Sequence, residues 1–422
     1  MLTDNTENRQ VSSGAVVTHD YHPLDPEFIK RMYDFYDEVR PQAPVCYSPE
    51  YDVYLISRFD DIVDVLKRRE VFSAQNTLSP FKPVYPSAQA ILDTGFGRQP
   101  TFSNCDPPRH TKMRSAAMKC LNPARWKSVE PAIRADIARL VDKIAREEVC
   151  DIAADFIFPL TARAGFTLIG FPPEDFDLLL SWCGNRVLLT YGDLSEEEQQ
   201  AAARDLVGFW SYCQKFVRER NANPVGDLTS DLLQVARESN GDVTVEDVDN
   251  MVYSLALASH ETTANAMLNG FNNLLRRRDV WNRLKQDRSL IPGAVEELIR
   301  LDSPTIQLRR LVLADTQVGG VPIPKGATLV LLQGSGNRDP AQFVAPHDLD
   351  IDRANAGEHL AFGKKWHFCL GAPLARFEYS AVLEALLDRL PNLELVADQT
   401  VEYVPILLLR APRQLLVRPN AG

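Results

Sequence analysis

The residue whose position most clearly indicates chemistry is Cys369, because a long stretch of helical periodicity follows it. A thiol at a helix N-terminus lies near free backbone N–H groups and the positive end of the helix dipole, and both favour a thiolate. A single cysteine is nevertheless more often an inert buried residue. Zinc and iron–sulfur sites need several thiolate or imidazole ligands, and Cys369 has no neighbouring cysteine. One thiolate suffices where a macrocycle supplies the other ligands, so the metal group that fits is haem.

A buried haem needs cationic or hydrogen-bonding partners for its two propionates, and three places in the sequence offer them. His110 and Arg114 are four residues apart, so on a helix they share one face, although a surface pair would look the same. Arg309 and Arg310 begin a strand-like run, in which alternation turns only one of them inward. His367 stands too close to the cysteine to bind the same iron easily, which favours an orienting role.

A second polar group follows the most apolar helical stretch of the chain. The helical pattern opens with a capping-box-like Thr244-x-x-Asp247 and continues for about 30 residues, long enough to cross a whole domain. Its middle, residues 251–258, is apolar on every face, which is typical of a helix buried on all sides. Glu261 and Thr262 come directly afterwards and are costly to bury unless hydrogen-bonded or hydrated. Two interpretations stay open. The first is a solvent-facing stripe, or Ser and Thr hydroxyls that bond back to the carbonyls one turn earlier. The second is a groove in which Glu261 and Thr262 organise water and move protons.

The elements that must position these residues are mostly helical. From residue 109 to about residue 285 the apolar residues recur at helical spacing, and helix resumes after Cys369. Residues 51–72 indicate a strand followed by an amphipathic helix. Residues 304–336 indicate strands divided by Gly-Gly and Pro-x-Pro. The expected fold class is therefore mainly α with minor β, an α+β fold.

The organisation of the chain predicts one folded unit. Residues 1–20 are polar and predict a disordered tail, whereas residues 21–422 contain no internal repeat or flexible linker and predict a single catalytic domain. Residues 75–108 are rich in proline and predict a long loop, of the kind that forms lids or binding loops.

Composition and charge exclude several function classes. A formal charge of -11 argues against a general affinity for nucleic acid or for an anionic membrane, because both reward a clustered basic face. No run of about 18 apolar residues occurs, so neither a membrane anchor nor a secretion signal is expected. The 7 cysteines are an odd number, are spread over the chain and include no CxxC pair, which fits a reducing cytoplasm.

Taken together, these residues resemble the cytochrome P-450 family, in particular its soluble bacterial type, from about residue 50 to the end of the chain. The haem-binding signature of that family reads F-G-x-G-x-H-x-C-x-G. Residues 362–371 match it at every fixed position except Lys365, where the family has glycine. Phe362, His367, Cys369 and Gly371 are among the matching residues.

Further motifs of the family lie far from the cysteine. The Glu-x-x-Arg motif is met by Glu297 and Arg300, and the meander that follows it supplies Arg353. The resemblance implies that these three residues lock the fold on the cysteine side.

The A-G-x-[DE]-T-T groove of the family is met by residues 258–263. By resemblance Ala258 contacts the cofactor, and Glu261 with Thr262 delivers protons to iron-bound dioxygen. His110 and Arg114 match the family's propionate contacts.

The resemblance also implies a fold and an activity. The fold would be a triangular helical prism, with haem b between the long central helix and the helix that follows Cys369. Cys369 would be the axial ligand, and Arg310 rather than Arg309 would face a propionate. The activity would be that of a monooxygenase that uses dioxygen to hydroxylate, epoxidise, demethylate or couple a moderately hydrophobic small molecule. Electrons would come from a ferredoxin or flavodoxin with its NAD(P)H-dependent reductase.

Two departures from the family pattern matter for this site. Ser259 replaces the glycine at which the central helix opens, so its side chain would narrow the oxygen groove or bond a carbonyl one turn back. Lys365 puts a Cβ where glycine is usual, so it would adopt a less favoured backbone region. With both Ser259 and Lys365 in view, a non-catalytic haem-binding or peroxide-using protein stays open as the alternative.

Two surfaces are expected around this centre. A basic patch for an acidic electron donor would comprise Lys112, Lys119, Arg125, Lys364 and Lys365. The substrate pocket would be lined by residues 75–97, 305–307 and 404–409, whose apolar and aromatic side chains suit a hydrophobic molecule.

Overall fold

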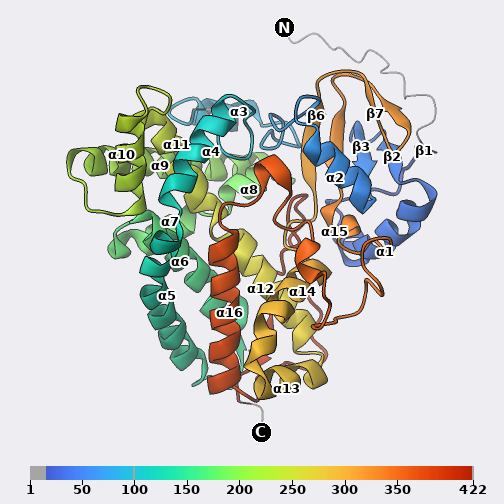
Figure 1. The fold of residues 1–422 in the computed structure, drawn as a ribbon, viewed down its shortest axis with the longest axis vertical. Helices are drawn as coiled ribbons and strands as arrows, with labels where there is room; N and C mark the ends of the chain where they lie inside the picture. Colours follow the sequence, from blue (N-terminus) through green and yellow to red (C-terminus); the bar gives the residue numbers. More distant parts are fainter. Residues whose placement is uncertain (1–15, 98–99, 421–422) are drawn as a thin grey trace.

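The computed structural model of the chain describes residues 16–97 and 100–420, and these form a helical part and a smaller β-rich part side by side (Figure 1). The fold class expected from the sequence, mainly α with minor β, is confirmed. The predicted disordered tail falls largely on residues 1–15, which lie outside the described residues. Its last part is wrong, because Val16–Val17 form a strand paired in parallel with Cys46 and Tyr47.

Helices account for most of the described chain. They are α1 (Pro26–Gln42), α2 (Phe59–Lys67), α3 (Pro86–Leu92), α4 (Arg109–Cys120), α5 (Pro123–Ile144), α6 (Phe158–Ile169), α7 (Phe176–Trp182), α8 (Asn185–Tyr191), α9 (Glu196–Ala222), α10 (Leu228–Glu238), α11 (Val245–Ala258), α12 (Glu261–Leu274), α13 (Arg278–Gln286), α14 (Ile291–Leu301), α15 (Gln333–Gly336) and α16 (Ala372–Arg389). Short turns of tighter or wider helix lie at Ala153–Ile157, Pro173–Asp175, Arg288–Leu290, Ala356–Glu358 and Lys365–His367.

The strands form one larger sheet and two small ones. They are β1 (Val16–Val17), β2 (Val45–Ser48), β3 (Val53–Ile56), β4 (Phe72–Ser73), β5 (Cys150–Asp151), β6 (Leu308–Val312), β7 (Thr316–Val318), β8 (Val321–Ile323), β9 (Thr328–Leu331), β10 (Glu394–Leu395) and β11 (Leu416–Arg418). The larger sheet has the order β1-β2-β3-β9-β6-β4, in which β3 pairs in parallel with β9 and β6 pairs antiparallel to it. In this pair Arg309 and Arg310 of β6 lie opposite Val330 and Leu329 of β9.

The long loop expected at residues 75–108 contains a helix. Residues 86–92 form α3, with Pro86 in its first turn, where the missing N–H of proline costs nothing. Ala88 and Leu92 are buried, and α3 packs against α9. The proline-rich composition concealed this helix because a proline that begins a helix resembles a proline that breaks one.

The long central helix predicted from Thr244 is wrong as a single element. The capping box of Thr244 and Asp247 is present, but the helix ends at Ala258 and a second one begins at Glu261. At the break, His260 has φ -106° and ψ -74°, outside the usual helical range. The helical pattern continues across the break, so periodicity alone gave no sign of it.

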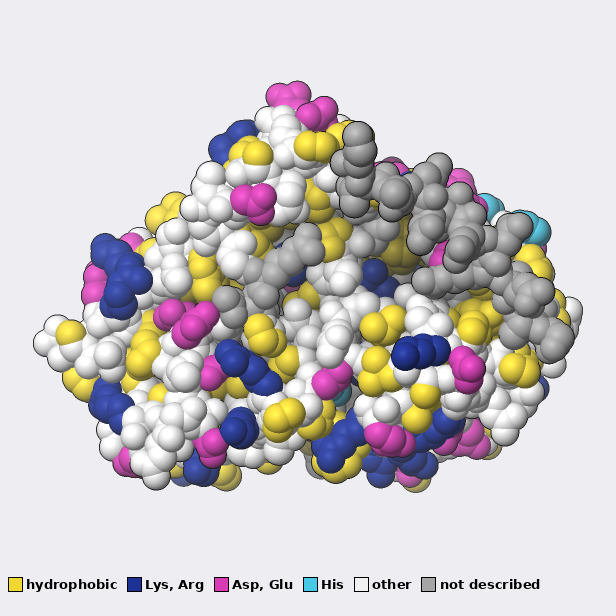
Figure 2. Space-filling model, turned by 90° about the horizontal axis from the view of Figure 1, so that it is seen from above, with side chains coloured by type: hydrophobic (Ala, Val, Ile, Leu, Met, Phe, Trp, Pro, Cys, Tyr) yellow, Lys and Arg dark blue, Asp and Glu magenta, His cyan; other side chains and the backbone are white. Residues whose placement is uncertain are grey.

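The helical core surrounds α12 and α16. Helix α16 packs against α5 and α14, and α12 packs against α14 and α6. None of the helices in the described ranges combines the length and apolar character needed to cross a bilayer. Seen from above, basic and acidic side chains are interspersed over much of the surface (Figure 2).

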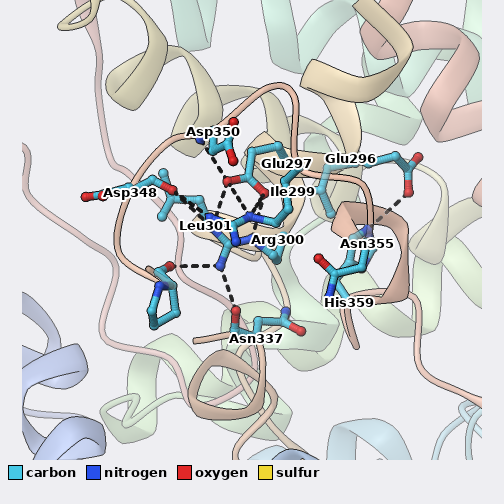
Figure 3. A network of polar contacts seen from close by, with 12 residues as sticks. Glu296, Glu297, Ile299, Arg300, Leu301, Asn337, Asp348, Asp350, Asn355 and His359 are labelled. Atoms are coloured by element: carbon cyan, nitrogen blue, oxygen red, sulfur yellow. Dashed lines mark hydrogen bonds and ion pairs between the residues drawn. The ribbon is translucent and has the colours of Figure 1, made fainter. Parts of the chain in front are cut away.

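A buried network of charges joins α14 to the segment that leads to Cys369 (Figure 3). Arg300 donates two hydrogen bonds to the Glu297 carboxylate, at 2.7 and 2.8 Å, and Arg353 Nε lies 3.0 and 3.1 Å from its two oxygens. The remaining Arg300 donors reach the carbonyls of Asn337 and Pro346, both at 2.8 Å. The side chains of Glu297 and Arg300 are fully buried. This arrangement supports the structural role implied for the three charged residues.

Replacing Glu297 with glutamine should destabilise the fold, because two buried guanidinium groups then lack a carboxylate. Removal of one partner from a buried ion pair costs about 3–5 kcal/mol, and we expect urea denaturation to show a loss of unfolding free energy of that size. The control Arg283→Gln breaks an exposed pair with Asp352 and should cost about 1 kcal/mol or less. Equal stability of the two variants would contradict this role of Glu297.

Candidate functional site

Cys369 lines a cavity of about 270 Å³ where the two halves of the central helix meet β6 and the loop before α16. The cavity brings together most of the residues singled out in the sequence: Arg114, Ala258, Thr262, Arg310, Phe362, His367, Cys369 and Gly371. These residues come from five separate stretches of the chain. His110 and Glu261 do not line this cavity, but each adjoins a residue that does. His110 stacks on His367, and Glu261 precedes Thr262 in the chain.

The Cys369 sulfur lies at the N-terminal end of α16, as expected. Its backbone N–H donates to the Phe362 carbonyl at 2.8 Å, which closes the loop that precedes it. The Cys369 side chain is exposed to the cavity, and desolvation by the surrounding protein raises the pKa of the thiol above its usual value. Backbone hydrogen bonds from Gly371 and Ala372 and the charge of Arg114 act in the opposite direction. The helix end therefore lowers the cost of a thiolate without making it the favoured form. A bound metal ion would have to supply the rest.

The loop before Cys369 has the strained backbone that the sequence predicts. Lys365 has φ +57°, in the left-handed region that glycine adopts more easily, and Gly363 has φ +67°. A short helical turn, Lys365–His367, follows. Next to it, the Arg69 guanidinium lies 3.5 Å from the centre of the half-exposed Trp366 ring. This cation–π contact holds the turn against α2.

Two histidines stack beside the cavity. The ring centres of His110 and His367 are 4.1 Å apart, and His367 Nδ1 lies 3.0 Å from the carbonyl oxygen of Phe102. Burial lowers the pKa of His110 to about 4 and that of His367 to about 3, so both rings are neutral near pH 7. His110 is buried, and its Nε2 has no hydrogen-bond partner in the described structure. Arg114, on the same helix, donates to the Phe368 carbonyl at 2.6 Å.

Arg309 and Arg310 are both buried, so the expectation that only one turns inward is wrong. Strand alternation still separates them, because Arg310 lines the Cys369 cavity whereas Arg309 donates to the carbonyls of Thr77 and Ser79. Arg310 donates only to neutral oxygens, the Arg309 carbonyl at 2.7 Å and Thr77 Oγ1 at 3.4 Å. Burial lowers the pKa of Arg310 to about 10. It is a buried cation that faces the cavity.

The helix break is shaped by contacts with α6. Ser259 Oγ donates to the Ala256 carbonyl at 3.3 Å, one of the two roles expected for it. A Cβ on Gly165 of α6 would lie 1.9 Å from Ser259 Oγ, so Ser259 fits only because residue 165 is glycine. The following His260 is buried, and its Nδ1 lies 3.0 Å from Thr161 Oγ1. The sequence gave no sign that Gly165 and Ser259 would meet.

Glu261 and Thr262 share one cavity, but only Thr262 also lines the Cys369 cavity. Thr262 Oγ1 donates to the Ala258 carbonyl at 3.0 Å, and Thr262 lines both the Cys369 cavity and a second cavity of about 1150 Å³. Glu261 lines only the second cavity. It lies near Gly184, where an added Cβ would be 3.1 Å from Glu261 Oε1. Burial raises the pKa of the Glu261 carboxyl to about 7. The Thr262 hydroxyl thus bonds back to a carbonyl one turn earlier, one of the expected alternatives, and the residue also borders both cavities.

The large cavity matches much of the expected substrate pocket. Residues of the 75–97 segment and Leu408 and Leu409 line it, and Thr305 lines the Cys369 cavity. Ile306 packs instead in the core around α1. Gln307 Oε1 accepts a hydrogen bond from Tyr21 at 2.6 Å, so it is structural.

The expected basic patch is reduced by ion pairs. Lys112 lies 2.6 Å and Arg125 2.5 Å from an aspartate carboxylate, and burial lowers the pKa of the half-buried Lys364. Lys119 and Lys365 remain exposed.

A second ion-pair group, formed by Glu296, Arg376 and His359, was not predicted from the sequence. Arg376 donates to both oxygens of Glu296 at 2.5 and 2.9 Å, and His359 Nε2 lies 3.4 Å from the same carboxylate. The Arg376 guanidinium lies 4.6 Å from the centre of the Phe362 ring. Burial would raise the pKa of Glu296, but the hydrogen bonds of Arg376 and His359 lower it to about 2. The only signal in the sequence was a second glutamate next to Glu297.

The chain is similar to several known proteins. The family model described as cytochrome P450 matches residues 197–417. The chain is 31% identical over 389 residues to the putative cytochrome P450 YjiB of Bacillus subtilis, covering 90% of this chain and 91% of that protein. It is 33% identical over 346 residues to a steroid C26-monooxygenase of Mycobacterium tuberculosis, covering 82% and 88%. The solved structure of cytochrome P450 CREJ in complex with (4-ethylphenyl) dihydrogen phosphate is similar with a TM-score of 0.90 and 34% identity, covering 95% and 99%.

Glu261 should make stability depend on pH. Because burial raises its pKa from 4.5 to about 7, the folded protein holds a proton that the unfolded chain releases. This contribution is complete below pH 4.5 and is lost as the pH rises through 7. We expect the Tm of the wild type to fall relative to that of Glu261→Gln between pH 5 and pH 8. A constant Tm difference over that range would show that the pKa is not raised.

Proposed function

Since the chain belongs to the cytochrome P450 family, whose members bind haem through a cysteine thiolate, we propose that Cys369 would supply the thiolate that holds haem b in a dioxygen-dependent monooxygenase. The observation that carries this proposal is the cavity in which Cys369 and the buried cation Arg310 face the same space. Arg310 has no carboxylate at ion-pair distance among the described residues. An isolated buried cation is costly, so an anionic group that enters the cavity would stabilise it.

The other residues around the cavity also fit a haem. The Nε2 of His110 is buried without a partner, so it is available to a propionate. Arg114 adds a second guanidinium, and the stacked His367 holds the His110 ring in place. Ala258, Phe362 and Gly371 contribute apolar side chains and backbone surface. When bound, haem supplies the activation of dioxygen, which electron donation from a thiolate favours.

The protein's own contribution to the chemistry is the handling of protons. Thr262 donates its hydroxyl proton to the Ala258 carbonyl, so its oxygen lone pairs are free to accept from water in the Cys369 cavity. Glu261, with a pKa of about 7, both releases and takes up protons at neutral pH. Because Thr262 borders both cavities, water between them would connect the carboxyl to the site of reaction. We therefore assign the catalytic roles to Glu261 and Thr262.

The substrate is a moderately hydrophobic small molecule that occupies the large cavity. The reaction is hydroxylation, epoxidation, demethylation or coupling, and an aryl phosphate like the ligand of CREJ is one candidate substrate.

The electrons come from a separate ferredoxin or flavodoxin with its reductase, and the exposed Lys119 and Lys365 favour an acidic donor. Reduction rates that do not change with salt would contradict that choice. The 7 free cysteines support a cytoplasmic location.

The alternative is that the protein uses peroxide or binds haem without catalysing a reaction. It would have no need of an acid and a hydroxyl at the helix break, so the presence of Glu261 and Thr262 favours the dioxygen route. Consumption of reduced cofactor that depends on substrate, measured with a surrogate electron donor, separates these functions.

Replacement of Cys369 by serine tests the metal ligand. We expect the reduced carbon monoxide complex of Cys369→Ser to lose its thiolate-type absorption band, because serine cannot supply sulfur to the iron. The control Cys183→Ser changes a half-buried cysteine outside the Cys369 cavity and should keep the band. Survival of the band in Cys369→Ser would refute the assignment.

Replacement of Thr262 by alanine tests proton delivery. With a substrate that the wild type turns over, product formed per reduced cofactor consumed should fall by about tenfold or more, because the hydroxyl that organises water is lost. Thr262→Ser keeps the hydroxyl and should retain most of the coupling. Unchanged coupling in Thr262→Ala would remove Thr262 from the mechanism.

A further inference from the structure

One end of the large cavity is lined by an arginine among aromatic rings. Arg186, in α8, is half-buried, and its guanidinium lies 5.4 Å from the centre of the Phe96 ring. The Phe96 ring packs edge-on against Tyr253 at 5.7 Å, and Trp210 packs against Tyr253 at 5.4 Å. All four residues line the same cavity. A cation and three rings at one place make a site for a molecule with an apolar body and a charged end.

Arg186 is poorly satisfied by the protein itself. Its one hydrogen bond runs from Nη2 to the Leu78 carbonyl at 3.2 Å, and no carboxylate lies at ion-pair distance among the described residues. The guanidinium group has five N–H donors in a planar fork that matches carboxylate and phosphate oxygens. Most of its donors are therefore available to a ligand.

Tyr253 supplies an independent sign of a missing partner. Its side chain is 4% exposed, and its hydroxyl is buried without a hydrogen bond in the described structure. A buried unpaired hydroxyl costs free energy, so native proteins rarely keep one without a reason. Burial raises the pKa of Tyr253, and the charge of Arg186 opposes that rise, so the two groups lie close enough to interact.

The acidic groups of the cavity are engaged elsewhere. Asp106 accepts from the Ala74 N–H at 3.0 Å and from Ser73, and Asp93 accepts from Gln89 at 2.6 Å.

The remaining charged residues of the cavity, Arg109 and Glu261, do not form an ion pair with Arg186 either. Arg109, a second cation of the cavity, is ion-paired with Asp247. Glu261 is half-protonated near pH 7 because its pKa is about 7. Arg186 is thus the cation of the cavity that has no acidic partner among the described residues.

We propose that Arg186 and Tyr253 bind the anionic headgroup, a carboxylate or a phosphate monoester, of the substrate. This inference rests on the proposed function and names the class of molecule that the site takes. Tyr253 and Ala258 lie on the same helix five residues apart, which is about 7 Å along its axis. Because Ala258 lines both cavities, a body about as long as one substituted ring reaches from the headgroup to the Cys369 cavity.

Calorimetry on the haem-loaded protein tests this proposal with three probes of one shape. They are 4-ethylphenyl phosphate, 4-ethylbenzoate and the neutral 4-ethylanisole. The wild type should bind one or both anions more tightly than the neutral compound, and the preferred anion identifies the headgroup. Binding of the neutral probe at least as tight as that of both anions, or no binding of either anion, overturns the proposal.

Variants separate the charge from the shape of the cavity. Arg186→Gln should raise the Kd of the preferred anion by about 10- to 100-fold, Tyr253→Phe by about 3- to 10-fold, and Arg186→Lys by less than Arg186→Gln. The Kd of the neutral probe should change less than about twofold in each, because the rings remain. The control Arg204→Gln alters an exposed arginine of α9 that lines neither cavity.

Two results from the variants would contradict the proposal. An equal loss for neutral and anionic probes in Arg186→Gln would mean that Arg186 only supports the loop at Leu78. An unchanged anion Kd would mean that it has no contact with the ligand. Since calorimetry needs no turnover, neither result bears on Cys369 as the metal ligand, which the carbon monoxide spectrum tests separately.

Discussion

The buried carboxylate of Glu297 is the constraint on which the cysteine side of the molecule depends. One carboxylate holds two guanidinium groups, and these in turn hold five backbone carbonyls of the segment from Asn337 to Asp348. A charge in the interior is costly unless every part of it is paired, so the segment has little freedom to move without exposing an unpaired charge. That segment leads directly into the loop of Cys369. The position of Cys369 thus depends on a charge network centred some seventy residues earlier in the chain.

The resemblance and the helical periodicity predicted the fold class, the strands before and after the helical region, and the placement of Cys369 at the start of α16. The left-handed backbone conformation of Lys365 could be predicted from the sequence, because local steric rules govern a position at which glycine is usual. What failed were features decided by tertiary contact. Ser259, at the helix break, fits against α6 only because residue 165 is glycine. Helix α3 begins with a proline that composition alone would treat as a breaker, and it packs against α9.

The sequence predicted which residues form the site but not which cavity each of them lines. Cys369, Arg114 and Arg310 line one cavity as expected, whereas Glu261 lines only the neighbouring cavity, which it shares with Thr262. Adjacent residues at a helix start diverge by about 100° around the axis, so a motif that names both does not say that both face the same group. The Glu296, Arg376 and His359 group escaped prediction because an ion pair across 80 residues leaves no periodic signal.

The hydrogen bond between His367 and the Phe102 carbonyl has a consequence for communication across the molecule. The short stretch from Thr101 to Ser103 lines the large cavity at Thr101 and Ser103 and the smaller one at Phe102 and Ser103. A molecule in the large cavity would contact the same short stretch whose Phe102 carbonyl lies 3.0 Å from the imidazole two residues before Cys369. This shared backbone segment is a direct structural connection between the two cavities.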